Sequence, residues 1–281
     1  MENSLKKVRR IGNTKLNLII SVVLTAILLA ICIIAPYVVP YDPNAQDLSI
    51  SLSAPSSAHL FGTDKFGRDV FSRVLCGGAP SIFGSIIIVI IVTVIGVAFG
   101  VAAGYFGGRV DSFISKITDI FLAFPGMVLA VAIAGMLGIG IVNAIIALVA
   151  VRWTKFARLA RSKTISIKEN TFIQACKVSG LSDFNIIVKH IIPNIMGEIM
   201  ITVMLDVGVT MLELAGLSFL GLGVAPPTAE WGYMLNEGRS YLQTCPWIVL
   251  YPGCAIIITV MILNYLGDSI RDFLDPRYKE I

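Results

Sequence analysis

Three carboxylates interrupt an apolar stretch of the sequence at residues 195–222. Glu198, Asp206 and Glu213 are eight and seven residues apart, so on a helix they fall within a sector of roughly 80°. Acids in such an apolar helix are costly and face either a cavity or a partner. They can attract a cation or a chelated metal along a pathway, or they can bond a neighbouring helix or Arg152. We expect the second role for Glu198 and leave both open for Asp206 and Glu213.

Methionines follow the same segment at helical spacing. Met196, Met200 and Met204 are four residues apart, and Met211 lies further on. Thioethers are soft ligands for transition metals, but we prefer the interpretation that they provide adaptable packing between moving helices. No metal site is assigned beyond a speculative one at the two later acids. The candidate pathway residues are Asp206, Glu213, Met204 and Met211.

The sequence lacks the common catalytic and nucleotide-binding motifs. It contains no GxxxxGK[ST] phosphate loop, no HExxH zinc pair and no GxSxG nucleophile. The five cysteines lack CxxC spacing; a disulfide between Cys76 and Cys245 is left open, and small apolar filler is the preferred role for all five. We therefore expect a non-catalytic chain without a cofactor of its own. Energy for active transport would come from an ion gradient or from another polypeptide.

Composition predicts a membrane protein. Hydrophobic residues make up 56% of the chain and charged residues 14%, whereas soluble domains carry about a quarter charged residues. A membrane-spanning helix needs about 20 apolar residues. The uncharged run at 120–151 is too long for one helix, and Gly135, Gly138 and Gly140 predict a turn inside it. The sequence thus predicts six spans, at residues 16–38, 79–104, 113–136, 140–160, 194–221 and 246–267.

Basic residues orient these spans. They gather in the N-terminal tail and in the segment 161–193, so the positive-inside rule predicts that both termini and that segment are cytoplasmic. The first span has no small-residue cleavage site, and we interpret it as a retained signal anchor. The net charge of +4 indicates contact with anionic lipid and is no evidence for nucleic acid. The expected organisation is a basic tail (1–15), a first span (16–38), an extracytoplasmic loop (39–78), a transmembrane domain (79–267) containing a cytoplasmic coupling loop (161–193), and a cytoplasmic tail (268–281).

The polar segment 171–194 must face water between two apolar spans. Residues 171–178 can form a short helix, and Gly180 can end it in a left-handed conformation. Residues 181–192 can form a second helix, which we expect to stop at Pro193. We expect this segment to contact another molecule on the aqueous side.

This segment resembles the EAA motif of bacterial ABC-importer permeases. Gln174, Cys176 and His190 differ in type from the residues that the family uses there. The resemblance implies that the segment couples the membrane domain to an ATPase. The matching positions are Gln174, Ala175, Cys176, Gly180, His190, Ile192 and Pro193.

Six other segments resemble the C-type permease subunits of dipeptide, oligopeptide and nickel importers. Residues 205–208 and 228–231 look closer to the nickel-type subunits. The resemblance implies an all-α polytopic protein with the ABC type I importer permease fold, in the inner (plasma) membrane of a bacterium. It implies import of nickel or a metal chelate, with di- or oligopeptide import as the alternative. The six segments are residues 59–73, 104–111, 122–125, 216–223, 226–232 and 267–276.

The resemblance also implies partners. These are a homologous B-type permease forming a heterodimer, two cytoplasmic ATPases that bind ATP and Mg, and an extracytoplasmic substrate-binding protein. A less favoured alternative is an ion-coupled secondary transporter, but that class often has inverted repeats and this sequence shows no internal repeat. Four residues near the outer face are expected either to brace the outer loop or to dock the binding protein: Arg68, Asp69, Arg73 and Trp231.

Overall fold

The computed structural model describes the backbone of residues 2–274 and the side chains of residues 14–273. Within these residues the regular elements are all helices, apart from an isolated antiparallel bridge between Thr63 and Asp69. The all-helical prediction is confirmed. Most of the predicted basic tail and the end of the predicted C-terminal tail lie outside the residues whose side chains are described. The elements are α1 (Glu2–Val38), η1 (Leu48–Ile50), α2 (Val70–Phe106), α3 (Gly108–Leu122), α4 (Gly126–Leu137), α5 (Ile141–Lys168), α6 (Thr171–Val178), α7 (Asp183–Ile186), the π turn η2 (Ile187–Ile191), α8 (Ile192–Phe219), α9 (Trp231–Gly238), η3 (Arg239–Tyr241) and α10 (Trp247–Leu274).

Several of these helices can cross a membrane. Four stretches of the described chain are long and apolar enough, and the bent pair of α3 and α4 makes a fifth if it counts as one span. Helix α5 carries basic residues from Arg152 onward, so its apolar part is short. The count of six spans and the side on which the termini lie stay predictions. The four stretches are Thr14–Val38, Val70–Phe106, Asp183–Phe219 and Trp247–Phe273.

The predicted span at residues 113–136 is broken within its length. Helix α3 ends at Leu122, α4 begins at Gly126, and the two are bent by 85°. Pro125 causes the break, because proline has no backbone N–H to donate and disfavours helical geometry in the residue before it. The carbonyl of Pro125 then accepts from the N–H of Leu129 at 3.1 Å and starts the new helix.

A glycine turn separates α4 from α5, as the sequence predicts. Gly138 has φ of 88° and Gly140 has φ of 153°, a region that favours glycine. The side-chain amide of Asn143 donates to the carbonyls of Leu137 and Gly138, at 2.9 and 3.1 Å, and so satisfies the end of α4. Gly135 lies within α4 and takes no part in the turn.

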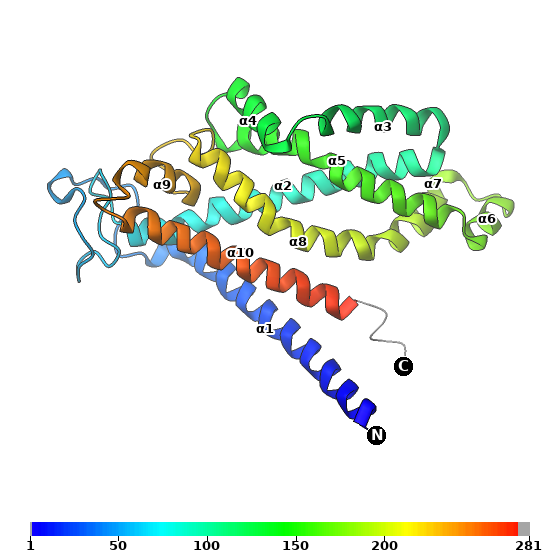
Figure 1. The fold of residues 1–281 in the computed structure, drawn as a ribbon, viewed down its shortest axis with the longest axis horizontal. Coiled ribbons are helices and arrows are strands. Elements are labelled where there is room, and N and C mark those ends of the chain that lie inside the picture. The colour runs from blue at the N-terminus through cyan, green and yellow to red at the C-terminus, as the bar shows by residue number, and fades with distance from the viewer. Residues whose placement is uncertain (1, 275–281) are drawn as a thin grey trace. The chain divides into compact units, whose positions relative to one another are not determined.

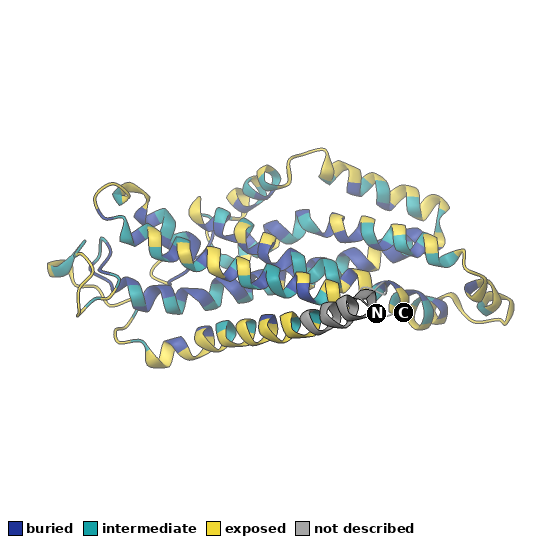
Figure 2. Ribbon diagram, turned by 60° about the horizontal axis from the view of Figure 1, so that its bottom comes forward, coloured by how far each residue is buried: buried dark blue, intermediate teal, exposed yellow. Residues whose placement is uncertain are grey.

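The chain forms two compact units, the first made of residues 1–86, 134–146 and 204–281 and the second of residues 87–133 and 147–203. In the first unit α1 runs beside α10 (Figure 1). Figure 2 shows that α1 is mostly exposed over residues 14–38, and most of the side chains exposed there are apolar, as at Ile19 and Ile33. Such a surface suits contact with lipid or with another subunit.

Glycines hold the helices of the second unit close together. A Cβ at Gly96 would lie 2.6 Å from the carbonyl oxygen of Trp153, and one at Gly104 would lie 2.8 Å from that of Arg161. Gly100, between them, faces the carbonyl of Ala157 at even closer range. Small residues four apart are the usual means by which membrane helices bring their backbones together. The sequence analysis did not use this spacing, although it can be read directly from the chain.

Candidate functional site

The segment that joins α5 to α8 is a built structure rather than a loose connection. We call residues 169–192, which contain α6, α7 and η2, the helical loop. Helix α6 covers Thr171–Val178, as predicted. After it Gly180 has φ of 80°, its N–H donates to the carbonyl of Lys177, and the N–H of Leu181 donates to that of Cys176. This pair of hydrogen bonds is a Schellman motif, so the predicted glycine C-cap is confirmed.

The second half of the helical loop differs from the prediction. Ser182 caps α7 by accepting from the N–H of Asn185 at 3.4 Å. The helix does not stop at Pro193; it passes through the π turn η2 and continues as α8. Proline cannot bond to the carbonyl four residues before it, and its ring would collide with that carbonyl. The wider π turn directly before Pro193 relieves this conflict.

The π turn also keeps one row of isoleucines on a single face. Ile186 and Ile191 are five residues apart, whereas Ile195 and Ile199 follow at steps of four. All four are buried in one cluster with Ile173 of α6. An extra residue per turn restores the alignment that a five-residue step would lose in a regular helix. The helical loop is therefore held by an apolar cluster that it shares with α2, α5 and α8.

The outer surface of the helical loop carries exposed apolar side chains among polar ones. Val178 is 90% exposed and Phe184 is 74% exposed, and Phe172 and Val188 are also exposed. Exposed apolar patches of this kind mark interaction sites. The predicted coupling residues share this surface only in part: Gln174, Ala175, Gly180 and Pro193 are exposed, while Cys176, His190 and Ile192 are half-buried.

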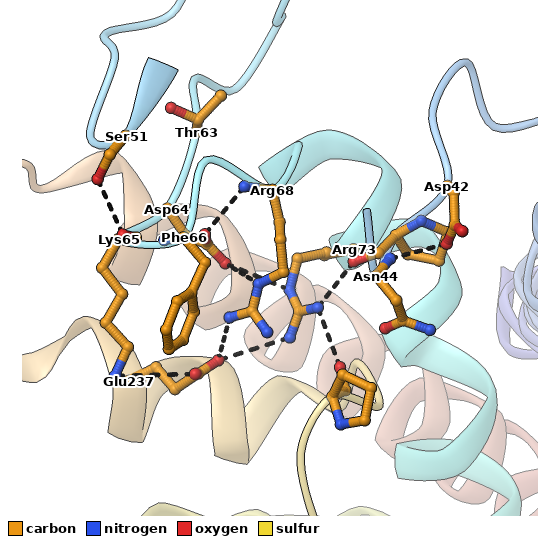
Figure 3. Close-up of polar contacts among 12 residues, drawn as sticks. Asp42, Asn44, Ser51, Thr63, Asp64, Lys65, Phe66, Arg68, Arg73 and Glu237 are labelled. Atoms are coloured by element: carbon orange, nitrogen blue, oxygen red, sulfur yellow. Dashed lines mark hydrogen bonds and ion pairs between the residues drawn. The ribbon is translucent and has the colours of Figure 1, made fainter. Parts of the chain in front are cut away.

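A second polar site lies in the first unit, in residues 39–78 and 222–245, which we call the cap. Figure 3 shows the guanidinium groups of Arg68 and Arg73 side by side between two carboxylates. Arg68 donates to Asp64 from Nε and to Glu237 from Nη2, both at 2.6 Å. Arg73 lies 3.6 Å from Asp64 and 3.5 Å from Glu237. Each arginine is only 1% exposed, so the four charges balance inside the protein.

Arg73 also bonds to two segments of the cap that are far apart in the sequence. Its Nη1 donates to the carbonyl of Pro43 at 2.8 Å and to that of Pro227 at 3.2 Å.

The carboxylate of Asp69 accepts from the backbone and hydroxyl of Ser72, at 2.8 and 2.7 Å, and lies 3.0 Å from Nδ1 of His59. Asp69 thereby caps the first turn of α2.

Helix α9 is fixed to α2 by its N-cap residue and its first helical residue. Glu230 accepts from the N–H groups of Gly232 and Tyr233 at 3.0 and 2.8 Å and from the hydroxyl of Ser81 at 2.8 Å. Trp231 donates from its indole to the carbonyl of Val74 at 2.7 Å. Burial raises the pKa of Tyr233 above its ordinary value, and the neighbouring carboxylate of Glu237 adds to that rise.

The four predicted outer residues all lie in this buried network. Arg68, Asp69, Arg73 and Trp231 are between 1% and 4% exposed, so their contacts support the bracing interpretation. Direct contact of these side chains with a docking protein is not supported by their burial. The carboxylates that pair with the two arginines, Asp64 and Glu237, were not predicted, nor was the capping carboxylate of Glu230. Asp64 stands four residues before Arg68, a spacing that could have indicated an ion pair on sequence grounds.

The candidate pathway residues lie on α8. Asp206 and Met211 are each 1% exposed, whereas Met204 and Glu213 are half-buried. Glu198 is exposed and forms an ion pair with Lys163 of α5, which is the role expected for it. Among the residues with described side chains, no group of three His, Cys, Asp or Glu could hold a metal ion. The cysteines are free thiols, and Cys76 and Cys245 do not pair.

Comparison with known families agrees with this architecture. Residues 96–280 match the family described as "Binding-protein-dependent transport system inner membrane component". Residues 10–55 match "N-terminal TM domain of oligopeptide transport permease C". The first match covers more than half of the chain, so the protein belongs to that family of inner-membrane transport components.

Individual relatives are similar over nearly the whole chain. A probable D,D-dipeptide transport system permease protein of Escherichia coli K12 is 41% identical over 92% of this chain and 86% of its own length. The nickel transport system permease protein of the same strain is 39% identical over 85% of this chain and 86% of its own. A glutathione transport system permease protein of Pectobacterium atrosepticum is 40% identical over 87% and 82%.

Solved structures show the same fold. An inward-facing form of the MetNI methionine ABC transporter superposes with a TM-score of 0.60 at 17% identity, covering 73% of this chain and 97% of that chain. The protein is thus a multi-pass inner-membrane permease subunit of an ABC importer with the type I permease fold. Such permeases are non-catalytic subunits, so the expectation of a non-enzyme is confirmed.

Proposed function

We propose that this chain forms half of the translocation pathway of an ATP-driven importer, paired with a homologous B-type permease. Two ATPases, which bind ATP and Mg, dock on the helical loop from the cytoplasmic side, and a binding protein delivers substrate to the cap side. The observation that carries the proposal is the helical loop itself. Its isoleucines are buried in a cluster shared with α2, α5 and α8, and apolar side chains are exposed on its surface, as a firmly held element with a docking face requires.

The helical loop gives the ATPases a lever on the membrane helices. It continues into α8 without a break, so a push on α6 and α7 reaches the helix that carries the candidate pathway residues. Closure of the ATPases on ATP would stabilise one arrangement of the helices, and substrate delivery would stabilise the other.

Bulk at Gly180 tests this docking role. A side chain there meets no atom within 4 Å, although the positive φ strains any residue with a Cβ. We expect Gly180→Trp to abolish uptake with normal membrane insertion, because the indole projects from the docking face. Gly180→Ala carries the same backbone strain without the bulk and should retain most uptake. Full uptake by Gly180→Trp would show that the ATPases do not dock on the helical loop.

For the substrate we propose nickel or a metal chelate, with di- or oligopeptides as the alternative. The first choice is supported by the residues at 205–208 and 228–231 and by the buried Asp206 on α8. The alternative is supported by relatives named for dipeptide and glutathione transport at similar identity. We propose that Asp206, Glu213, Met204 and Met211 line or support the pathway.

Asp206→Asn distinguishes these substrates with almost no change in side-chain volume. Uptake of nickel(II), a dipeptide and glutathione is first measured for the unaltered importer. We then expect Asp206→Asn to lower nickel uptake by about tenfold, because it removes a charge that attracts a cation. Val209→Leu, at an exposed apolar position on the same helix, serves as a control that keeps the charge. Nickel uptake equal to that of the unaltered importer would assign Asp206 to helix packing.

A further inference from the structure

Tyr105 stands at the point where α2 meets the helical loop. It lies in the last turn of α2 and is 3% exposed. Its hydroxyl donates to Oδ1 of Asp183 at 2.6 Å. Asp183 is the first residue of α7, so this hydrogen bond joins the end of one long helix to the start of a helix in the loop. Hydrogen bonds from a hydroxyl to a carboxylate at this length are among the strong ones.

Two lysines reach the same tyrosine from other helices. Lys168, the last residue of α5, donates from Nζ to the backbone carbonyl of Tyr105 at 2.5 Å. The ammonium of Lys177, on α6, lies 5.1 Å from the centre of the Tyr105 ring, which is within cation–π range. Helices α5, α6 and α7 therefore all contact one residue of α2.

Tyr105 also makes apolar contacts, and their physical effect differs from that of its polar contacts. Tyr105 packs in the same buried cluster as Ile173 of α6 and Ile186 of α7. That cluster is non-directional and favours attachment of the loop without fixing its angle. The hydrogen bond from Tyr105 to Asp183 is directional, so it fixes α7 against α2.

We propose that Tyr105 is the positioning residue that passes a displacement of the helical loop to α2. The proposal rests on the proposed function, in which ATPases move that loop. With the hydroxyl in place, α2 and α7 move together. Without it the isoleucine cluster still holds the loop and its docking face, but the loop can tilt against α2 and absorb part of the movement.

The test is Tyr105→Phe in the complete importer, reconstituted in liposomes with its permease partner, both ATPases and the binding protein. The measured quantity is the number of substrate molecules imported per ATP hydrolysed. The probe is whichever of nickel(II), a dipeptide or glutathione the unaltered importer takes up. We expect this ratio to fall by about tenfold, the factor that a hydrogen bond to a charged group commonly contributes. Tyr37→Phe, which changes a tyrosine 87% exposed on α1, should leave the ratio unchanged.

A double-mutant cycle separates the hydrogen bond from general damage. Asp183→Ala removes the acceptor, and we expect the same fall; Asp183→Asn keeps an acceptor oxygen and should retain most of the ratio. The double variant should be no worse than either single one, because both remove one bond. An unaltered ratio in Tyr105→Phe, or additive losses in the double variant, would overturn the proposal. If Tyr105→Phe assembles poorly, an unaltered ratio in Asp183→Ala overturns it instead.

An error in the proposed function would give a different experimental result from an error in the positioning role. In that case the ATPases would not co-purify with the unaltered chain at all. For the positioning role, they should co-purify equally with the unaltered chain and with Tyr105→Phe, since the docking residues are untouched.

Discussion

At the scale of single residues, the cap depends on charges that are buried and balanced. Arg68 and Arg73 share the carboxylates of Asp64 and Glu237 inside the protein. Taking one charge away leaves another without a partner, and such an uncompensated buried charge is far more costly than the loss of a surface ion pair. Stability of the cap is therefore concentrated in a few side chains.

Glu237→Gln should destabilise the protein by about 3–5 kcal/mol, because two buried arginines would then share a single carboxylate. Lys65→Gln is the matched control: Lys65 approaches the same Glu237 only to 3.9 Å and is partly exposed, so its loss should cost less than about 1 kcal/mol. Thermal unfolding of the two purified variants in detergent measures the difference. Equal midpoints would mean that the cap does not depend on this pair.

At the scale of elements, close helix packing in the second unit follows from glycine at positions 96, 100 and 104 on α2. A Cβ at Gly100 would overlap the backbone carbonyl of Ala157. A backbone atom cannot rotate away as a side chain can, so the helices must separate. The stripe thus sets how closely α2 and α5 approach.

Opposite outcomes are expected for two glycine-to-alanine changes. Gly100→Ala should destabilise the protein by about 1–3 kcal/mol through overpacking. Gly197→Ala, on α8, meets nothing within 4 Å and should be neutral or slightly stabilising, since alanine favours helix. Thermal unfolding of both variants checks the signs. A stable Gly100→Ala protein would show that α2 and α5 are not in backbone contact.

The elements also show how far the sequence could predict this fold. Apolar runs located the long helices, and Gly180 located the end of α6, because these signals are local. The bend at Pro125 and the continuation of the helix through Pro193 were not foreseen. Both residues are prolines, and a proline alone does not decide whether a helix ends. Pro80 and Pro252 lie inside α2 and α10. Pro193 follows a π turn in a helix that continues, whereas α3 ends before Pro125.

The polar sites, too, could be predicted from the sequence only in part. Residue types and family resemblance brought out Arg68, Asp69, Arg73 and Trp231, but not that they are buried together. Their partner Glu237 lies 169 residues from Arg68. No local sequence pattern predicts a contact between residues so far apart in the chain. The network around Tyr105 was missed for the same reason, since it joins four helices through single contacts.

At the scale of the whole molecule, the chain is a membrane component that needs other polypeptides for energy and for substrate. Among the exposed apolar surfaces of the described residues, two kinds differ in their surroundings. Those along α1 suit lipid or a neighbouring membrane subunit, and those on the helical loop are set among polar residues such as Gln174 and Lys177. The second kind is the surface that an ATPase would cover.

Co-purification of the intact assembly tests the central claim most directly. The chain is expressed with its permease partner and its ATPases, isolated through a tag on this chain alone, and assayed for ATP hydrolysis with and without the binding protein loaded with substrate. The account predicts that both ATPases are recovered and that the loaded binding protein stimulates hydrolysis. Recovery of the chain without any ATPase, together with uptake that persists in cells lacking the ATPases and stops on addition of an uncoupler, would contradict it.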